Sequence, residues 1–278
     1  MDTEAPFGAY RPTGAVATML ALTQKTILGR GQTRKAIGNM LRQRTRTPID
    51  VQLWGRNARL HLQSNHAEMK AVLNPRNYSH RDFAFIRQQL TRTGTFLDIG
   101  ANAGMFSLFA SSLLGAGGCV VAVEPQPGLF ARLLYNMTVA NDLASEGVRT
   151  VLAQTAVGPV NGTAELAVPN ELGQASLSPH VGGARMSVPL IPLGDLLRRE
   201  GVTRVDVMKI DVEGYEDEVL QSFFEKEDRS LFPRAVLIEH CNSTRWKWDC
   251  IAHMKSIGYV QAHRDSANVF LTLQDARS

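Results

Sequence analysis

The chain has 278 residues, of which 44% are hydrophobic and 20% are charged, with a net charge of +4 at pH 7. This composition excludes a disordered chain, a collagen and a coiled coil. The three Cys lie far apart and form no Cys-x-x-Cys pair, so the sequence encodes neither a disulfide framework nor a zinc site. The length fits one large domain or two small ones.

The first part of the chain is basic. Residues 1–47 hold eight Lys or Arg residues and only two acidic ones. Such an arm contacts nucleic acid, a membrane surface or an acidic partner, or it is simply a solvated helical face. We favour the solvated face and expect no nucleic-acid partner, because the basic residues form no dense run. The N-terminus lacks a basic stretch followed by an apolar one, so we expect no secretory signal and a cytoplasmic protein.

The next segments carry a hairpin and a helix start. Apolar residues at helical spacing in the arm predict two short helices. Alternating residues at 51–54 and 60–62, around a Gly-containing turn, predict a β-hairpin. Ser79 and Asp82 precede an apolar helical pattern and resemble a capping box. We therefore divide the chain into a basic arm with a hairpin, residues 1–78, and a second domain, residues 79–278.

From residue 95 onward, short apolar runs alternate with helical patterns. The alternation predicts a doubly wound, Rossmann-like α/β fold with a parallel sheet. The uncharged stretch 99–123 is long enough to span a bilayer, but glycines cluster at its two ends. We therefore predict loop, helix, loop and strand there, and no transmembrane segment. The predicted strands are 95–99, 119–123, 148–157, 205–210, 235–238, 259–262 and 269–273, and the predicted helices are 105–114, 130–137, 219–223 and 248–257.

Ligands of such sheets bind where parallel strands end, and the turn after the first strand has suitable chemistry. Gly100 and Gly104 let a ligand approach the backbone, and the following helix start favours an anion. Asp98 would repel a dinucleotide pyrophosphate, and Asn102 replaces the second Gly of the dinucleotide pattern. S-adenosylmethionine suits this turn better, since it carries two cationic groups and a carboxylate. Glu124 ends the second strand and can accept both ribose hydroxyls, but NAD enzymes use an acid there too.

The most distinctive stretch follows a later strand. Alternation places Lys209, Asp211 and Glu213 on one side of residues 207–216, if the strand extends that far. Three charged groups at a strand end cost desolvation energy unless function or mutual pairing offsets it. The alternative interpretation is a structural Lys–Asp pair followed by a helix cap.

Residues 96–104 and 123–125, and above all Lys209–Glu216, resemble the FkbM family of S-adenosylmethionine-dependent methyltransferases. The resemblance runs from about residue 83 to residue 270. It implies a class I methyltransferase fold, S-adenosylmethionine as cofactor, and O-methylation of a sugar or natural-product hydroxyl. From the resemblance and from the residues themselves we assign three sets of site residues: to the cofactor Asp98, Gly100, Ala101, Asn102, Gly104, Glu124, Pro125, Asn141 and Ala156; to the acceptor Ser176, Glu239 and Trp246; and to methyl transfer Lys209, Asp211, Glu213 and His240.

Methyl transfer to a hydroxyl needs a base for the hydroxyl proton. Asp211 is our first candidate, His240 the second, and Lys209 would orient a carboxylate or hold the acceptor oxygen. Asp211, Glu213 and Glu239 could instead hold Mg²⁺, but spacing alone does not establish such a site, so we predict no metal. An NAD-dependent oxidoreductase and a non-catalytic binding module remain alternatives. Residues 161–189 are a candidate lid, and the sequence does not show which acceptor is used or whether the protein is oligomeric.

Overall fold

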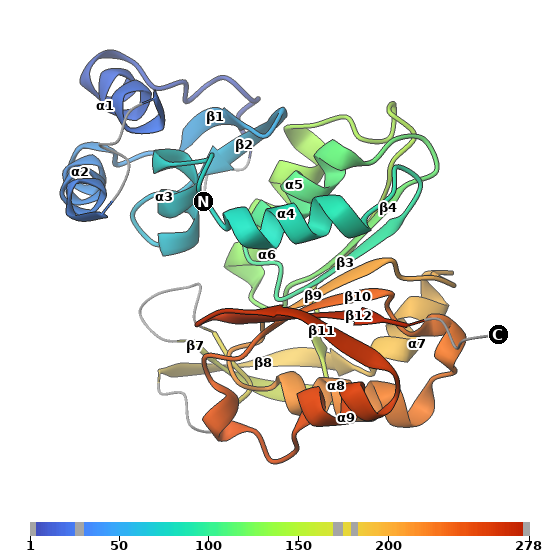
Figure 1. The fold of residues 1–278 in the computed structure, drawn as a ribbon. Coiled ribbons are helices and arrows are strands. Elements are labelled where there is room, and N and C mark those ends of the chain that lie inside the picture. Colours follow the sequence, from blue (N-terminus) through green and yellow to red (C-terminus); the bar gives the residue numbers. More distant parts are fainter. Residues whose placement is uncertain (1–3, 26–30, 169–174, 179–182, 275–278) are drawn as a thin grey trace.

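The computed structural model describes residues 4–25, 31–168, 175–178 and 183–274. Its centre is a seven-stranded sheet with the order β11-β12-β10-β9-β3-β4-β5 (Figure 1). The five strands from β10 to β5 are parallel, as predicted, whereas β12 runs antiparallel to both of its neighbours, β10 and β11, and makes the sheet mixed. The strands span Thr95–Ile99 (β3), Cys119–Val123 (β4), Arg149–Ala153 (β5), Val207–Ile210 (β9), Ala235–Glu239 (β10), Tyr259–Arg264 (β11) and Asn268–Leu273 (β12).

Helices cover both faces of this sheet (Figure 1), and alternate strand residues face the two helix layers. Phe96 in β3 packs in one hydrophobic core, and its neighbour Leu97 packs in the other. The fold is therefore the doubly wound α/β fold that the sequence predicts. On the side of Phe96 lie α4 (His80–Gln89), α5 (Met105–Leu113) and α6 (Pro127–Leu134), and on the side of Leu97 lie α7 (Leu193–Arg199), α8 (Glu216–Lys226) and α9 (Cys250–Ser256).

One predicted strand is wrong in its extent. The run 148–157 divides into β5 and the short β6 (Ala156–Val157), which belongs to a separate three-stranded sheet. Gln154 is exposed between them, and the Thr155 hydroxyl donates to the carbonyl of Pro189 at 3.0 Å, which turns the chain toward the second sheet. The polar residues Gln154 and Thr155 stand at this break, and the prediction wrongly continued the strand through them.

The second sheet includes the candidate lid segment. In it β6 pairs with β8 (Ala184–Ile191), which pairs antiparallel with β7 (Gly162–Val168). Ser176 forms an antiparallel bridge with Ala167. Apart from residues 175–178 and 183, the segment between β7 and β8 lies outside the described residues, so its role as a lid stays a prediction.

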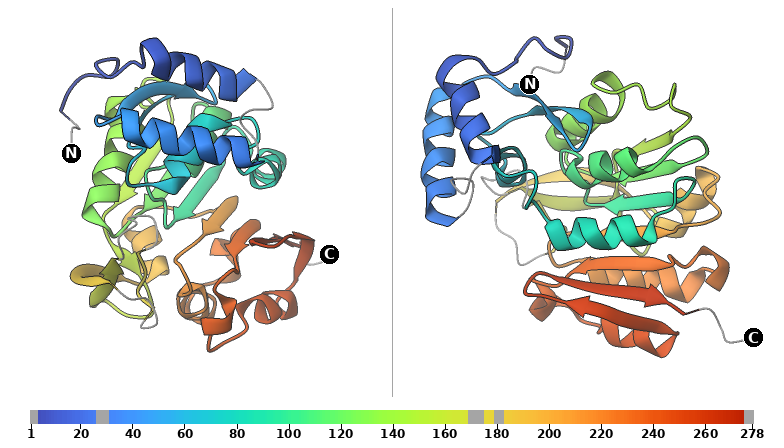
Figure 2. Two further views of the ribbon diagram at one scale, coloured as in Figure 1. Left: turned by 90° about the vertical axis from the view of Figure 1, so that its left-hand side faces the viewer. Right: turned by 45° about the horizontal axis from the view of Figure 1, so that its top comes forward.

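The N-terminal part forms a lobe beside the main domain (Figure 2). It contains the two predicted helices, α1 (Gly14–Lys25) and α2 (Gly31–Arg44), the predicted hairpin of β1 (Ile49–Leu53) and β2 (Arg56–Leu60), and α3 (His66–Leu73). The division of the chain at residue 78 stays a prediction.

Buried ion pairs fix this lobe. The Arg59 Nε lies 2.8 Å from the Asp50 Oδ1, and the guanidinium lies between the rings of Tyr10 and Tyr135. Arg132 on α6 reaches across to the Glu68 carboxylate of α3 at 2.8 Å. Burial raises the pKa of Glu68, and Arg132 opposes that shift. Because breaking a buried pair is costly, the lobe is a fixed wall of the protein.

The predicted capping box at Ser79 is wrong. Ser79 precedes α4 but has a φ of 41°, and its side chain makes no capping hydrogen bond to the helix. A capping residue normally has extended backbone angles that aim its oxygen at the first-turn N–H groups. The left-handed backbone of Ser79 does not meet that condition.

Residues 99–123, the uncharged stretch that is long enough to span a bilayer, fold into separate short elements. They form a turn, α5, a second turn and β4, as predicted. In the part of the chain that the structure describes, no helix combines the length and apolar character needed to cross a bilayer.

Candidate functional site

A cavity of about 550 Å³ opens at the carboxyl ends of β3, β4, β9 and β10. Its size lies within the range of small-molecule sites, and its position is where ligands bind in open α/β sheets. The N-terminal lobe and the second sheet supply its other walls. Eleven predicted site residues line it: Gly100, Ala101, Asn102, Glu124, Pro125, Ala156, Ser176, Lys209, Asp211, Glu213 and Glu239.

The turn after β3 needs its glycines for a reason that the sequence did not reveal. Gly100 has a φ of 74°, and a Cβ there would lie 1.9 Å from the carbonyl oxygen of Asp211. Gly104 has a φ of 89°, and its Cβ would lie 2.8 Å from the Leu133 Cδ1. The predicted reason was ligand approach, whereas the structure shows close approach of protein groups. Gly100 lines the cavity, but Gly104 does not.

Glu124 is fixed in the cavity wall by backbone hydrogen bonds. Its Oε2 accepts from the N–H of Asn102 at 2.8 Å, and its Oε1 accepts from the N–H of Gln126 at 2.9 Å. The Asn102 side chain is held in turn, since its Oδ1 accepts from the Asn65 Nδ2 of the N-terminal lobe. Burial raises the pKa of Glu124 to about 7. The carboxylate is therefore fixed in place and keeps lone pairs for ligand hydroxyls.

Lys209 lies at the centre of the charged groups. Its Nζ donates to the carbonyl of Gly100 at 3.1 Å and lies 3.3 Å from the Asp211 Oδ2 and 3.7 Å from the Asp98 Oδ1. Burial alone would lower the pKa of Lys209, but the two carboxylates outweigh burial and raise it. The Lys–Asp pairing that we held as a structural alternative is therefore present, and it lies inside the cavity wall.

Asp98 is buried behind this wall. Its Oδ2 accepts from the Ser107 hydroxyl at 2.7 Å, and burial raises its pKa against the opposing charge of Lys209. Asp98 does not line the cavity, so its assignment to the cofactor stays a prediction. In the structure it supports Lys209 and the start of α5.

The loop after β9 is held in an unusual conformation. Glu213 has a φ of 58°, and its carbonyl accepts from the Ser176 hydroxyl at 2.9 Å. Burial and then the charge of Asp211 raise the pKa of Glu213 to about 7. Glu216 is fully buried and accepts hydrogen bonds from the N–H of Val212 and from the Trp246 indole. Glu216 therefore holds the loop that presents Asp211 and Glu213, a role that we had not assigned to it.

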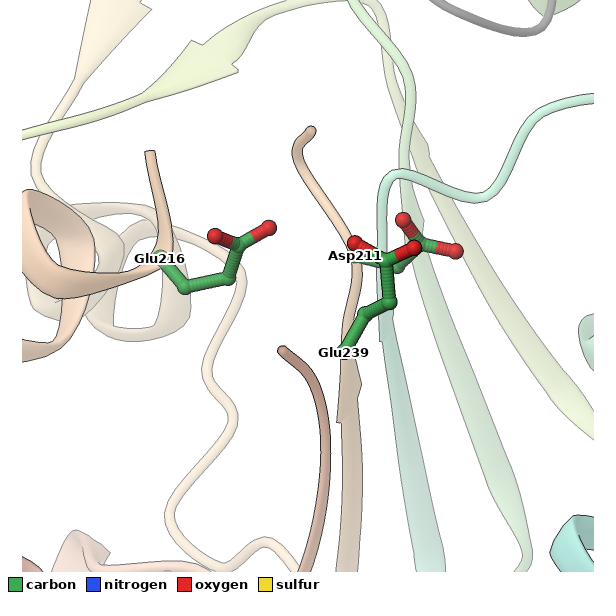
Figure 3. A group of neighbouring side chains, drawn as sticks. All are labelled: Asp211, Glu216 and Glu239. Carbon is green, nitrogen blue, oxygen red and sulfur yellow. The ribbon is translucent and has the colours of Figure 1, made fainter. Parts of the chain in front are cut away.

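Three carboxylates from separate elements meet beside this loop (Figure 3). Oxygen atoms of Asp211, Glu216 and Glu239 lie within 4.8 Å of one another. Burial and then the charge of Asp211 raise the pKa of Glu239 to about 8. The group differs from the Mg²⁺ donor set that we considered, since Glu216 takes the place of Glu213. The hydrogen bonds that Glu216 accepts reduce the lone pairs that a cation could use, and we assign no metal here.

Besides Gly104 and Asp98, three further predicted site residues do not line this cavity. The His240 Nε2 lies 3.0 Å from the carbonyl of Asp265. The Asn141 Nδ2 donates to the carbonyl of Asn57 at 2.9 Å and supports the hairpin. Trp246 lines a separate, shallower hollow. Their assigned roles stay predictions that these positions do not support.

Polar residues from outside the predicted site complete the cavity. Tyr78 and Asp82 come from the segment before β3, and Asn268 comes from β12. The Asn268 Nδ2 donates to the Asp82 Oδ1 at 3.1 Å, and burial raises the pKa of both Tyr78 and Asp82. Sequence reasoning missed these residues because each stands alone in the chain, and only tertiary folding brings them together.

Comparisons with known proteins concern the same region. Residues 98–265 match the profile of the methyltransferase FkbM domain. A curated relative, the methyltransferase sdnD of Sordaria araneosa, is 31% identical over 161 residues. That match covers 47% of this chain and 60% of the relative, so the chain spans less than two thirds of the relative's length.

Two solved structures are among those that the chain resembles. The O-methyltransferase from Bacillus cereus in complex with SAH has a TM-score of 0.41 at 11% identity and covers 93% of this chain and 97% of that one. Fibrillarin from Aeropyrum pernix with bound S-adenosyl-L-methionine has a TM-score of 0.40 at 14% identity, with coverage of 69% and 74%.

Proposed function

Because the chain belongs to the FkbM methyltransferase family and is an S-adenosylmethionine-dependent methyltransferase, we propose that it methylates a hydroxyl group of a sugar or natural product. The family match disfavours the oxidoreductase and binding-module alternatives. The observation that carries the proposal is the position of Asp211, a partly exposed carboxylate in the cavity that is paired with Lys209. A hydroxyl is a weak acid, so its methylation benefits from such a base.

The residues of the cavity fit S-adenosylmethionine. No side chain caps the start of α5 beside the Gly100 turn, and an uncapped helix start attracts a carboxylate. Glu124 offers acceptor oxygens for ribose hydroxyls. The apolar side chains of Leu129, Ala156 and Val157 line the wall near Glu124 and suit an adenine ring.

The chemistry divides between the cofactor and the chain. When bound, S-adenosylmethionine supplies an electrophilic methyl group. Asp211 accepts the hydroxyl proton of the acceptor, and Lys209 fixes the orientation of the Asp211 carboxylate. Tyr78, Asp82 and Asn268 offer hydrogen bonds to the other polar groups of the acceptor. Holding the acceptor hydroxyl in one orientation lowers the entropic part of the barrier.

The proposed reaction is tested by the chemical identity of the product. The protein is incubated with methyl-labelled S-adenosylmethionine and a panel of sugars, polyketide alcohols and amines, and the products are identified by mass spectrometry and NMR. We expect label on oxygen. Label found only on nitrogen or carbon would contradict O-methylation, while leaving the family assignment intact.

We expect the Glu124→Ala variant to bind S-adenosylhomocysteine at least tenfold more weakly, about 1.4 kcal/mol. The variant removes the acceptor for ribose hydroxyls and frees the N–H groups of Asn102 and Gln126. Isothermal titration calorimetry measures the affinity. Glu165→Ala is the matched control, since Glu165 is exposed on β7 and does not line the cavity. Equal affinities of both variants would contradict the assignment of Glu124.

We also expect kcat/KM to rise between about pH 6 and pH 9. Glu213 and Glu239 have pKa values raised to about 7 and about 8, so they are protonated below this range and ionise within it. Their negative charges then favour transfer of the acceptor's hydroxyl proton to the Asp211 carboxylate. The Glu239→Gln variant keeps position 239 neutral at every pH. Its kcat/KM should therefore stop rising at a lower pH and reach a lower plateau. An unchanged pH profile for that variant would exclude Glu239 from the titration.

A further inference from the structure

The charges in the cavity wall are separated by structural element. The strand ends contribute the carboxylates Asp211, Glu213 and Glu239, with Lys209 among them. The N-terminal lobe contributes Arg34 from α2 and Lys70 from α3. The cavity is therefore acidic where the strands end and basic where the lobe closes it.

The two cations of the lobe lack a protein counter-charge. Within the described ranges, no ion pair involves the Arg34 guanidinium or the Lys70 ammonium. Lys70 is exposed and Arg34 is half-buried, whereas the buried cations Arg59 and Arg132 pair with Asp50 and Glu68. Two cations from separate helices that face one cavity make a site for an anion, since their charges add there.

The cofactor does not need these cations. Its carboxylate can bind at the uncapped start of α5, next to the Gly100 turn. An anion carried by the acceptor would be repelled by the carboxylates at the strand ends. The acidic end of the cavity thus favours the hydroxyl that loses its proton, and the basic end favours a negative group elsewhere on the acceptor.

We propose that Arg34 and Lys70 form a subsite for an acidic group of the acceptor, either a carboxylate, a sulfate or a phosphate. The proposal rests on the proposed function and narrows the acceptor to a hydroxylated small acid. The amide side chains of Asn74 and Asn77 line the cavity wall that the lobe provides. They supply neutral hydrogen bonds to an acceptor that extends toward the cations.

The test uses the full chain saturated with S-adenosylhomocysteine, so that the cofactor site is filled. Inorganic phosphate is titrated by calorimetry at constant ionic strength into the wild type and into the Arg34→Ala/Lys70→Ala double variant. Lys35→Ala/Arg44→Ala is the matched control, because it removes the same charge from exposed positions of α2 that do not line the cavity. Circular dichroism verifies that all three proteins are folded.

We expect the double variant to bind phosphate at least tenfold more weakly than the wild type, and the control to stay within twofold. We expect S-adenosylhomocysteine to bind all three proteins with similar affinity. Equal phosphate binding by the wild type and the double variant, or binding by neither, would overturn the subsite. A tenfold loss of S-adenosylhomocysteine affinity in the double variant would overturn it too, because the cations would then hold the cofactor carboxylate. None of these binding results depends on whether the methylated atom is oxygen, so the product analysis tests the proposed function separately.

Discussion

Replacing Asp211 by Asn should reduce kcat by a factor of about 10² to 10⁴ and leave S-adenosylhomocysteine affinity within a few-fold of the wild type. The range is that expected for loss of a positioned general base. Asn keeps the size of the side chain but cannot accept the hydroxyl proton. Lys209 retains the nearby Asp98 carboxylate at 3.7 Å, so the variant should not leave an isolated buried charge. Single-turnover kinetics measures the chemical step.

The control for this variant is Asp228→Asn, an exposed carboxylate away from the cavity. It should have the wild-type rate. If Asp211→Asn also keeps its rate within threefold, Asp211 is not the base. If the variant loses S-adenosylhomocysteine affinity in parallel with rate, Asp211 holds the cavity together instead. Comparing kcat with the dissociation constant separates these roles.

The main sheet could be predicted because its buried strands appear in the sequence as short apolar runs. β4 consists of five buried residues and has the predicted bounds, 119–123. The predicted helix 105–114 likewise matches α5 to within one residue. The break between β5 and β6 was missed although Gln154 and Thr155 stand there, because only the pairing with β8 shows that β6 belongs to another sheet.

The candidate site likewise has a part that the sequence predicts and a part that it does not. Residues that follow parallel strands, such as Glu124, Asp211 and Glu239, meet at one edge of the sheet, and topology alone brings them together. Asp82 and Asn268 meet through folding of segments 186 residues apart, which no local pattern reveals. His240 follows β10 as expected, but its ring lies against the carbonyl oxygen of Asp265 and does not line the cavity. Strand position thus predicts where a residue lies but not where its side chain points.

Glu216 shows how a motif can be recognised while its internal roles are missed. The sequence placed it at the end of Lys209–Glu216 and suggested only a helix start. In the structure its carboxylate holds Val212, Gly214 and Trp246. These bonds stabilise the left-handed conformation of Glu213, which costs energy for a residue other than Gly. The loop after β9 is therefore held in place, and Gly100 packs against it.

Replacing Gly100 by Ala should lower the free energy of unfolding by about 2 to 5 kcal/mol and remove S-adenosylhomocysteine binding. The φ of 74° costs about 1 to 2 kcal/mol for a residue with a Cβ. The collision adds the cost of overpacking, about 1 to 3 kcal/mol. Its partner is the Asp211 carbonyl, 1.9 Å from the added atom. That carbonyl cannot move easily, because the Asp211 N–H is bonded to Ile99 and the following residues are held by Glu216.

Gly201→Ala separates strain from collision. Gly201 has a similar φ of 64°, but an added Cβ would meet nothing within 4 Å. Its loss of stability should therefore reflect backbone strain alone, about 1 to 2 kcal/mol, with S-adenosylhomocysteine affinity unchanged. Urea unfolding of the two variants measures the difference. Equal losses would mean that the loop after β9 yields to the methyl group, and the close contact between the two strand-end loops would then not be what requires glycine at position 100.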